Sequence, residues 1–376
     1  NMDEEVVAAG FRNRTVLVTG AAGSIGSELC RQLASFGVGK LVLFDSAETP
    51  MHNIRLELEE RFPHLEFVPV VGDVRLKARV RMIFERYRPD VVFHAAAYKH
   101  VPLMEENPCE AVVVNAIGTQ HVADLCVEYG VEKMVMISTD KAVNPTNVMG
   151  ASKRLAEVYV QSLGVSIAEG RTPGRTRFVT TRFVNVLGSN GSVIPRFMEQ
   201  IRHGGPVTVT HPEITRFFMT ILEACRLVME AATISEGNEI MVFEMGGSTR
   251  ISDLAKRMIE LAGYVPGVDI EIKYTGLRPG EKLYEEVLSD MENTTPTIHK
   301  KIKLAKVRKY GYEEVRLAFR ELERRALSVD VRGTVMLMKE VIPEFVSKNS
   351  PFEALDAEFA ARRNGKGDTP EGAAAG

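Results

Sequence analysis

The chain of 376 residues contains no tryptophan and only four cysteines, and its charges nearly balance at a net charge of −3. This balance argues against the basic surface that nucleic-acid binding requires. No apolar run is long enough to span a bilayer, and the N-terminus lacks a signal-peptide pattern. The cysteines show no metal-type spacing and stand in apolar or helical surroundings (Cys30, Cys109, Cys126 and Cys225). We therefore predict a globular protein without a metal site, with its thiols reduced and buried.

Short β-branched runs alternate with longer helical patterns through the first half of the chain. The runs are TVLVT from Thr15, LVLF from Leu41, FVPVV from Phe67, VVFHA from Val91, MVMIS from Met134 and RFVTTRF from Arg177. They are almost wholly apolar, as strands buried on both faces are. Amphipathic stretches such as IGSELCRQLASFG and VRLKARVRMIFERY lie between them. The pattern predicts an α/β fold with a doubly wound parallel sheet.

The sequence pattern changes after about Asn185, where loop-rich segments replace the regular alternation of strand and helix patterns. We expect residues 1–12 to be an extension that runs directly into the first strand. Residues 13–185 are predicted to form a dinucleotide-binding domain, completed by part of 213–248. Residues 186–345 are predicted to form a smaller, interleaved α/β substrate domain. The Gly/Ala-rich end of 346–376 has nothing to bury, which indicates a partly disordered tail. The abrupt N-terminus fits either a native end or a cut in a longer protein.

Three glycines, Gly20, Gly23 and Gly26, follow the first predicted strand and open a helix. Glycine permits the tight turn and lets the backbone approach a pyrophosphate, while the helix N-terminus offers unpaired N–H groups to the anion. With Ser24 and Ile25 between them, these residues predict a dinucleotide phosphate site.

An acidic residue, Asp45, ends the second predicted strand. A carboxylate there accepts hydrogen bonds from an adenosine ribose and repels a 2′-phosphate, which favours NAD over NADP. The alternative is a solvated loop carboxylate. Other strand ends add small or acidic groups, and the predicted cofactor site includes Ser46, Asp73, Val74, Ala95, Ala96 and Ala97.

The stretch STDKAVNPTNVMGASK begins at the end of the fifth predicted strand. Ligands of open α/β sheets bind at such carboxyl ends, so Thr139, Asp140 and Lys141 are candidate catalytic residues. The alternative is an Asx-type turn or helix cap ahead of Pro145. Lys153 follows Met149 by four residues and shares its helical face.

Five stretches carry a family resemblance: TGAAGSIGSEL, AAAYKHVPLMEENP, STDKAVNPTNVMGASKR, TRFFMTI and GLRPGEKLYEE. They resemble the extended short-chain dehydrogenases/reductases, and within them the CapD-like nucleotide-sugar 4,6-dehydratases of bacterial polysaccharide biosynthesis. The resemblance implies a Rossmann fold, catalytic NAD with Asn115 in its site, and UDP-N-acetylglucosamine as substrate. The implied product is a UDP-4-keto-6-deoxy-N-acetylhexosamine, made by C4 oxidation, water elimination across C5/C6 and hydride return to C6. Many members resemble the catalytic half of a membrane protein, which implies the cytoplasmic side and a tether to the inner membrane in a longer native protein.

In most relatives a tyrosine stands where this chain has Met149, which cannot exchange a proton. We assign Lys141 as the base at C5 and Asp140 as the proton-transfer group at the 4-hydroxyl and the leaving water. Either residue can take the other's role, and one can serve twice. Thr139 would hydrogen-bond the 4-oxygen, and Lys153 would hold the nicotinamide ribose. We expect burial, or the neighbouring Lys153, to lower the pKa of Lys141.

The diphosphate and uridine of the substrate require cations and hydrogen-bond donors. Arg278 suits bidentate phosphate binding and Glu281 suits the ribose hydroxyls. By resemblance the substrate set also contains Lys99, His100, Asn185, Val193, Arg196 and Arg216. The alternative of a plain surface charge is strongest for Lys99 and His100.

Three other functions fit the same residues. They are a dehydratase that also inverts C5, a UDP-sugar 4-epimerase, and a non-catalytic NAD-binding protein for which Met149 is the best argument. We also expect a homo-oligomer. The stretch NPCEAVVVNAIGTQHVADLCVEYG fits either a pairing face or ordinary core.

Overall fold

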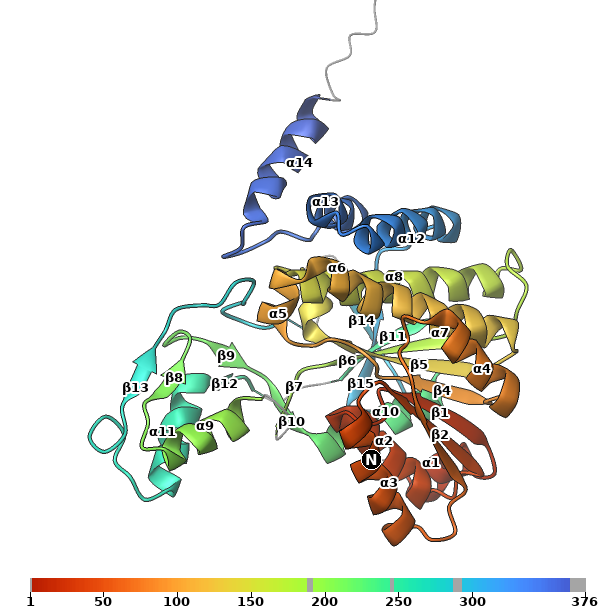
Figure 1. Ribbon diagram of the computed structural model, residues 1–376, viewed down its shortest axis with the longest axis horizontal. Coiled ribbons are helices and arrows are strands. Elements are labelled where there is room, and N and C mark those ends of the chain that lie inside the picture. Colours follow the sequence, from red (N-terminus) through yellow and green to blue (C-terminus); the bar gives the residue numbers. More distant parts are fainter. Residues whose placement is uncertain (1, 188–191, 244–246, 287–292, 366–376) are drawn as a thin grey trace, which may run out of the picture.

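The computed structural model describes residues 2–187, 192–243, 247–286 and 293–365 (Figure 1). Nine strands form the main sheet in the spatial order β14-β15-β11-β6-β5-β4-β1-β2-β3. The six strands predicted from sequence are confirmed as β1 (Thr15–Thr19), β2 (Lys40–Asp45), β3 (Phe67–Val71), β4 (Val91–His94), β5 (Lys133–Thr139) and β6 (Arg177–Phe183). All six and β11 (Glu239–Phe243) run parallel.

Helices cover both faces of this sheet, which confirms the doubly wound prediction (Figure 1). One apolar cluster lies under α1 (Glu4–Ala9), α2 (Ser24–Ser35), α3 (Glu48–Arg61) and α10 (Ile221–Ile234). A second cluster lies under α4 (Lys77–Tyr87), α7 (Gly118–Glu128), α8 (Val148–Ala168), α12 (Tyr312–Leu327) and α13 (Val331–Val341). All four cysteines are buried free thiols, as predicted.

The N-terminus differs from the prediction of an extension that enters the first strand directly. Residues Glu4–Ala9 form α1, and the Asp3 carboxylate caps it by accepting from the Glu5 N–H. Val7 and Phe11 are buried in the apolar cluster that α2 and α10 also cover. The helix is held in place because Val7 and Ala8 are buried on its inner side and Phe11, just past its end, packs into the same cluster.

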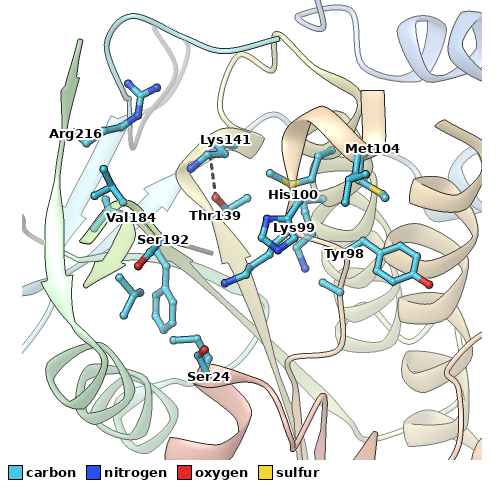
Figure 2. Close-up of a pocket in the computed structure, with 18 of the residues that line it drawn as sticks. Ser24, Tyr98, Lys99, His100, Met104, Thr139, Lys141, Val184, Ser192 and Arg216 are labelled. Atoms are coloured by element: carbon cyan, nitrogen blue, oxygen red, sulfur yellow. Dashed lines mark hydrogen bonds between the residues drawn. The ribbon is translucent and has the colours of Figure 1, made fainter. Parts of the chain in front are cut away.

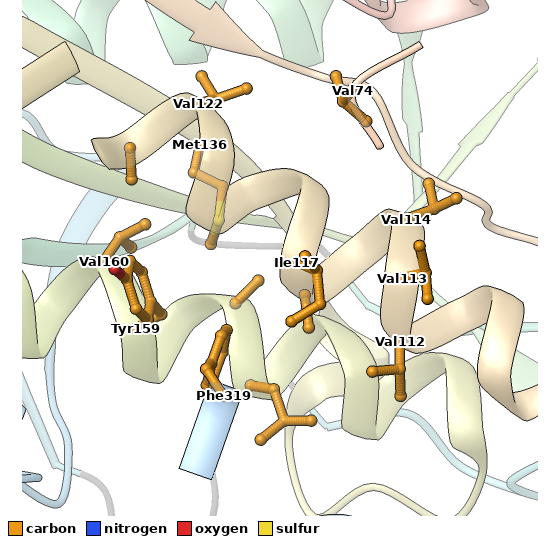
Figure 3. Packing of buried hydrophobic residues seen from close by; sticks show 14 of the residues in the cluster. Val74, Val112, Val113, Val114, Ile117, Val122, Met136, Tyr159, Val160 and Phe319 are labelled. Atoms are coloured by element: carbon orange, nitrogen blue, oxygen red, sulfur yellow. The ribbon is translucent and has the colours of Figure 1, made fainter. Parts of the chain in front are cut away.

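The stretch from residue 107 to 130 is core within a single chain. It forms α6 (Pro108–Ala111), a turn of π-helix η1 (Val112–Ile117) and α7, and α12 packs across η1 and α8. Figure 3 shows Phe319 of α12 beside Tyr159 of α8, with Ile117 nearby. The two rings lie 4.7 Å apart between centroids. Of the two interpretations of this stretch, the structure supports ordinary core.

A smaller lobe stands beside the main sheet and has an apolar cluster of its own (Figure 1). It contains α9 (Val193–Arg202), β8 (Val207–Val209), β9 (Thr215–Arg216), β12 (Thr249–Arg250), α11 (Ile251–Leu261) and β13 (Ile272–Tyr274). The pair β7 (Asn185–Leu187) and β10 (Phe218–Thr220) links it to the main sheet. The chain returns to the main sheet for α10 and β11, so the two parts interleave.

Residues 293–341, which the sequence assigned to the substrate domain, pack on the main sheet instead. β15 (Ile302–Lys306) pairs antiparallel with β11, and β14 (Asn293–Pro296) pairs antiparallel with β15 at the edge. The predicted tail 346–376 contains a helix, α14 (Glu353–Gly365), and residues 366–376 lie outside the described ranges. Across the described ranges no helix combines the length and the apolar character that crossing a membrane demands.

Candidate functional site

The glycine-rich loop between β1 and α2 has no room for side chains. Gly20 has φ +64°, and a Cβ there would lie 2.6 Å from the Ala95 carbonyl carbon. A Cβ on Gly26 would lie 1.9 Å from the Gly20 oxygen. The close approach of these backbones leaves the first turn of α2 open to an anion, which suits a pyrophosphate.

A smaller cavity of about 140 Å³ continues from this loop past the ends of β2 and β3. Its walls include nine of the predicted cofactor residues, Gly20, Gly23, Asp45, Ser46, Asp73, Val74, Ala95, Ala96 and Ala97. Asp45 accepts from the Ala22 N–H (3.0 Å) and the Ala47 N–H (2.9 Å). Burial alone would raise the pKa of Asp73, but hydrogen bonds from Arg75 outweigh it and lower that pKa. Two carboxylates and small residues fit an adenosine.

Asn115 does not line either cavity, but it ties the strand-end loop to the helix below the site. Its side-chain amide accepts from the Tyr98 N–H (2.8 Å) and donates to the Tyr98 oxygen (3.0 Å) and to Ser152 Oγ (3.0 Å). It sits in the π-helical turn η1, a local widening that recurs at functional sites. Asn115 therefore positions the loop that follows β4.

A buried histidine that the sequence did not single out lies under the same loop. His94 Nδ1 is 2.6 Å from Thr19 Oγ1, and Nε2 is 2.9 Å from Thr119 Oγ1. Thr119 donates to the Asn115 oxygen, so the His94 Nε2 carries the proton. Burial, with a smaller effect of Lys153, lowers the pKa of His94 to about 3. This neutral ring joins β1, β4 and α7.

Thr139, Asp140 and Lys141 form a short 3-10 turn, η2 (Asp140–Ala142), at the end of β5. Thr139 caps it, because its Oγ1 accepts from the Lys141 N–H (3.2 Å). The same hydroxyl donates to Asp140 Oδ1 (3.0 Å). The helix-cap interpretation is therefore correct for Thr139, and the cap aims Lys141 at the cavity (Figure 2).

Lys141 lies between two carboxylates, one of them unforeseen. Its Nζ is 3.4 Å from Asp140 Oδ1 and 3.6 Å from Glu285 Oε1. Burial would lower the pKa of Lys141, but these two carboxylates outweigh it and raise the pKa. The expected lowering is thus wrong, because sequence separation hid Glu285.

Lys153 is buried and donates to the Ile137 oxygen (2.8 Å). Burial lowers its pKa to about 8. Met149 is buried in the apolar cluster and also lines the cavity, as expected of a gap-filler beside a cofactor. Gly150 beside it lets α8 touch the η2 turn, since a Cβ there would lie 2.1 Å from the Lys141 oxygen.

One cavity of about 840 Å³ joins most of the predicted residues (Figure 2). Its lining includes Gly20, Gly23, Ser24, Ile25, Gly26, Ala95, Ala97, Lys99, His100, Thr139, Lys141, Lys153, Val193, Arg196, Arg216, Arg278 and Glu281. Asp140 is behind Lys141 and does not line the cavity. The backbone of Asn185 pairs with Phe218, and its side chain lies outside the described part of the structure.

The cations of the predicted substrate set differ in their surroundings. Arg216 donates to the Lys282 oxygen (2.8 Å), and its Nε is 3.1 Å from Glu285 Oε1. Arg196 donates to Thr208 Oγ1 (3.1 Å), and Arg278 is exposed at the rim. Burial and nearby Lys141 lower the pKa of Lys99. Arg278 and Lys99 are the cations best placed to meet a ligand.

Two distant segments fasten the loop 143–147 beside the site. The Gly280 oxygen accepts from Thr146 Oγ1 (2.7 Å) and Asn147 Nδ2 (2.9 Å). The Gly280 N–H donates to the Lys348 oxygen (2.7 Å), and the Lys348 N–H donates to the Thr146 oxygen (3.1 Å). We call residues 346–350 the strap. Residues 278–286 and the strap thus hold the loop 143–147 from one side.

A dinucleotide cradle, a strand-end Thr-Asp-Lys turn and Lys153 at one cavity define the extended class of short-chain dehydrogenases/reductases. Within that class, the chain belongs to the polysaccharide biosynthesis protein family, whose sequence pattern matches residues 16–307. It is 49% identical over 322 residues to the capsular polysaccharide biosynthesis protein CapD of Staphylococcus aureus. That alignment covers 85% of this chain and 53% of CapD, so the chain spans about half the length of this relative.

Two solved structures share the fold. Pen from Bacillus thuringiensis is 31% identical, with a TM-score of 0.71 over 82% of this chain and 98% of that one. The UDP-glucose 4-epimerase of Thermus thermophilus, in complex with NAD, is 25% identical, with a TM-score of 0.61 over 73% of this chain and 90% of that one. Both likenesses confirm the predicted fold class.

Proposed function

We propose that the chain is an NAD-dependent UDP-N-acetylglucosamine 4,6-dehydratase of surface-polysaccharide biosynthesis. The observation that carries this proposal is the convergence of Thr139, Lys141 and Lys153 on one cavity that is continuous with the glycine loop. Met149 occupies the same wall without a proton to exchange. The membership in the polysaccharide biosynthesis family supports the substrate class. Attachment of a longer native protein to the inner membrane, with the site on the cytoplasmic side, is part of the proposal.

The residues present fit NAD as the cofactor. Gly20 and Gly26 provide the cradle for a pyrophosphate, and Asp45 and Asp73 line the cavity at the adenosine end. The NAD complex of the Thermus thermophilus epimerase supports this choice. Lys153 would hold the nicotinamide ribose. When bound, NAD supplies the group that accepts the hydride from C4 and later returns it to C6.

The proton chemistry falls to the η2 turn. Thr139 Oγ1 accepts a hydrogen bond from the 4-hydroxyl and passes its own proton to Asp140 Oδ1, 3.0 Å away, so that Asp140 takes up the proton that the 4-hydroxyl loses. The 4-ketone then acidifies C5–H. Lys141, which lines the cavity, accepts that proton on Nζ, and the resulting ammonium returns a proton to the C6 oxygen as the C6–O bond breaks and water leaves. Lys141 thus serves as base and acid in turn. When the hydride returns to C6, the proton held by Asp140, which exchanges with solvent, passes through Lys141 (3.4 Å away) to C5, so that the net change is the loss of one water.

The sugar nucleotide is proposed to lie between the smaller lobe and the end of β4. Arg278 binds the diphosphate bidentately, and Glu281 accepts the uridine ribose hydroxyls. Arg216 holds the turn of Glu281, since its Nη2 is 3.6 Å from Glu281 Oε2. Lys99, His100, Arg196, Val193 and Asn185 complete the proposed set.

An NMR time course with UDP-N-acetylglucosamine in D₂O, without added reductant, tests the function. A new 6-methyl signal with deuterium at C5 is the expected result, and the C5 coupling pattern reports retention or inversion. The second candidate, a 4-epimerase, is favoured by the likeness to the Thermus thermophilus enzyme. It would give a C4 epimer without any 6-methyl signal. Absence of turnover across UDP-hexoses would support the non-catalytic interpretation.

The variant Lys141→Ala tests the assignment of the base. We expect turnover to fall about 10²- to 10⁴-fold, the usual contribution of a positioned proton-transfer group. NADH affinity should stay near that of the parent, because Lys141 is not part of the glycine loop. Near-normal turnover of this variant would overturn the assignment. Lys256→Ala, on the exposed surface of α11, is the matched control.

A further inference from the structure

Behind the η2 turn, four charged side chains from three distant segments of the chain meet. They are Asp140 and Lys141 of η2, Arg216 of β9, and Glu285. Glu285 Oε1 lies 3.6 Å from Lys141 Nζ and 3.1 Å from Arg216 Nε. Its other oxygen accepts from the Phe217 N–H (3.1 Å). A single carboxylate therefore joins the catalytic lysine to the smaller lobe.

Burial separates the roles within this cluster. The side chains of Asp140 and Glu285 are only 1% and 3% exposed, whereas Lys141 is 25% exposed. Lys141 and Arg216 line the cavity, but the two carboxylates do not. Glu285 therefore acts on a substrate only through Lys141 or Arg216.

We propose that Glu285 is a positioning residue that controls the charge of Lys141, an inference that rests on the proposed function. Ionised Glu285 holds the Lys141 ammonium in place and keeps its proton bound. A proton on Glu285 removes this hold, so that Lys141 can lose its own proton and then accept the one from C5.

The electrostatics of both groups agree with this geometry. Burial, and then the charge of Asp140, raises the pKa of Glu285 above the ordinary carboxyl range. Glu285 can therefore exchange a proton much nearer neutrality than an exposed glutamate does. Asp140 and Glu285 also raise the pKa of Lys141, although burial alone would lower it. Lys141 and Glu285 therefore influence each other's charge.

Three cations also lie near Lys141, and they come from three separate segments of the chain. Arg216 of β9 opposes the raised pKa of Lys141. Lys282, beside Glu285, and Lys99, after β4, each have a lowered pKa, mainly through burial and in part through Lys141. These three cations all favour a neutral Lys141. Asp140 and Glu285 are the two groups that work in the opposite direction.

Competitive labelling with trace acetic anhydride, read by mass spectrometry of the Lys141 peptide, gives the pKa of this amine without any turnover. In the parent protein we expect a value above the ordinary lysine value of 10.5. In Glu285→Gln the value should fall by about 1 unit or more, as for removal of an opposite charge within 4–6 Å. The glutamine can still accept from the Phe217 N–H.

Glu260→Gln is the matched control, because it makes the same change on the exposed face of α11. It should leave the labelling of Lys141 unchanged. An unchanged Lys141 pKa in folded Glu285→Gln would overturn the proposal. If Glu285→Gln fails to fold, the Lys141 pKa of the parent protein is the test. An ordinary or lowered value there would contradict the stabilisation of the Lys141 ammonium by Glu285.

Turnover gives a second readout. The acidic limb of the pH–rate profile should move to lower pH in Glu285→Gln, whereas Glu285→Asp, which keeps a carboxylate, should restore part of the shift. A purely structural role would lower the rate without moving the limb. The labelling result stands whether or not UDP-N-acetylglucosamine is the substrate, so failure of the proposed function and failure of this inference are distinguishable.

Discussion

At the scale of single residues, Lys153 shows a conflict between stability and chemistry. Its ammonium is buried, and burial lowers its pKa from 10.5 to about 8. In the unfolded chain the same group keeps its ordinary pKa, so between pH 10.5 and 8 the unfolded state binds more protons. The free energy of unfolding therefore falls as pH decreases through this window and is reduced in full below about pH 8.

We predict that Lys153→Met abolishes turnover but stabilises the dinucleotide-free protein at pH 7. The pKa shift corresponds to about 3 kcal/mol, and loss of the hydrogen bond to Ile137 offsets roughly 1 kcal/mol, which leaves a gain of about 2 kcal/mol. Urea unfolding at pH 7 and pH 10.5 measures it. The gain should shrink at the higher pH; a gain that is the same at both, or a loss at pH 7, would refute the explanation.

Gly150 sets the position of Lys141 through its missing side chain. A Cβ at this position would lie 2.1 Å from the Lys141 oxygen, so Gly150→Ala must push η2 away from α8. We expect a turnover loss of about 100-fold from the displaced lysine and a stability loss of about 1–3 kcal/mol from overpacking. Single-turnover kinetics and urea unfolding measure the two effects.

The matched control is Gly311→Ala, where the new methyl group would lie 4.0 Å from the Glu314 side chain. This variant should keep normal turnover. If Gly150→Ala also kept it, the contact with η2 would not be what places Lys141.

Which residues sequence could reveal depends on how each one acts. Gly20, Asp45 and Lys141 lie at or just past the carboxyl ends of strands, and the carboxyl end of a buried strand indicates a ligand site from sequence alone. Glu285 and Gly150 act only through tertiary contacts: one reaches a turn far away in sequence, and the other permits a close approach. No local pattern distinguishes them from a surface glutamate or an ordinary helical glycine.

At the scale of elements, the strap and the turn at Gly280 hold the loop 143–147. The Gly280 oxygen accepts from two side chains, Thr146 and Asn147. We predict that Thr146→Val loosens this turn, at a cost of about 1 kcal/mol, and weakens substrate affinity about fivefold. KM should rise while kcat changes little, because the turn carries Arg278 rather than the acid–base residues.

Steady-state kinetics measures this split. Thr233→Val, which removes a hydroxyl that donates to the Met229 oxygen within α10, is the control for loss of a hydrogen bond away from the site. A larger fall in kcat than rise in KM for Thr146→Val would place the effect of the turn on the chemistry instead.

The elements that sequence predicted best are those buried on both faces. β1 and β2 consist almost wholly of apolar residues, because helices cover both faces of the sheet and both faces of each strand are buried. β14 and β15 gave no such signal, because the edge strand β14 consists of polar residues and proline and β15 alternates lysine with apolar residues. Their place next to β11 is set by pairing and not by composition. Helix α1 was missed because it spans only six residues.

At the scale of the whole molecule, α12 and α13 cover the helical face formed by α6, η1 and α8. We therefore expect a homo-oligomer of this chain to use another surface. We predict that Phe319→Asp, which places a charge against Tyr159, detaches α12 and exposes this apolar face. The substitution should cost at least about 3–5 kcal/mol, the usual range for loss of a buried phenylalanine, and should increase self-association.

Sedimentation velocity at several concentrations, with urea unfolding alongside, measures the change. Leu317→Asp, on the exposed side of the same helix, is the control and should behave like the parent. Unaltered mass and stability in Phe319→Asp would mean that the covering helices contribute little to the main body.

The order of the segments along the chain has a consequence for synthesis on the ribosome. The glycine loop and the η2 turn are translated before residue 153, whereas Glu285 and the strap at 346–350 come much later. At roughly 5–20 residues per second, about 10 to 40 s separate Lys153 from the strap. During that interval a nascent chain holds the dinucleotide cradle while its catalytic lysine still lacks one carboxylate and its loop lacks both fastenings. Capture of a dinucleotide can thus precede completion of the site, which waits for segments translated about 130 to 200 residues after Lys153.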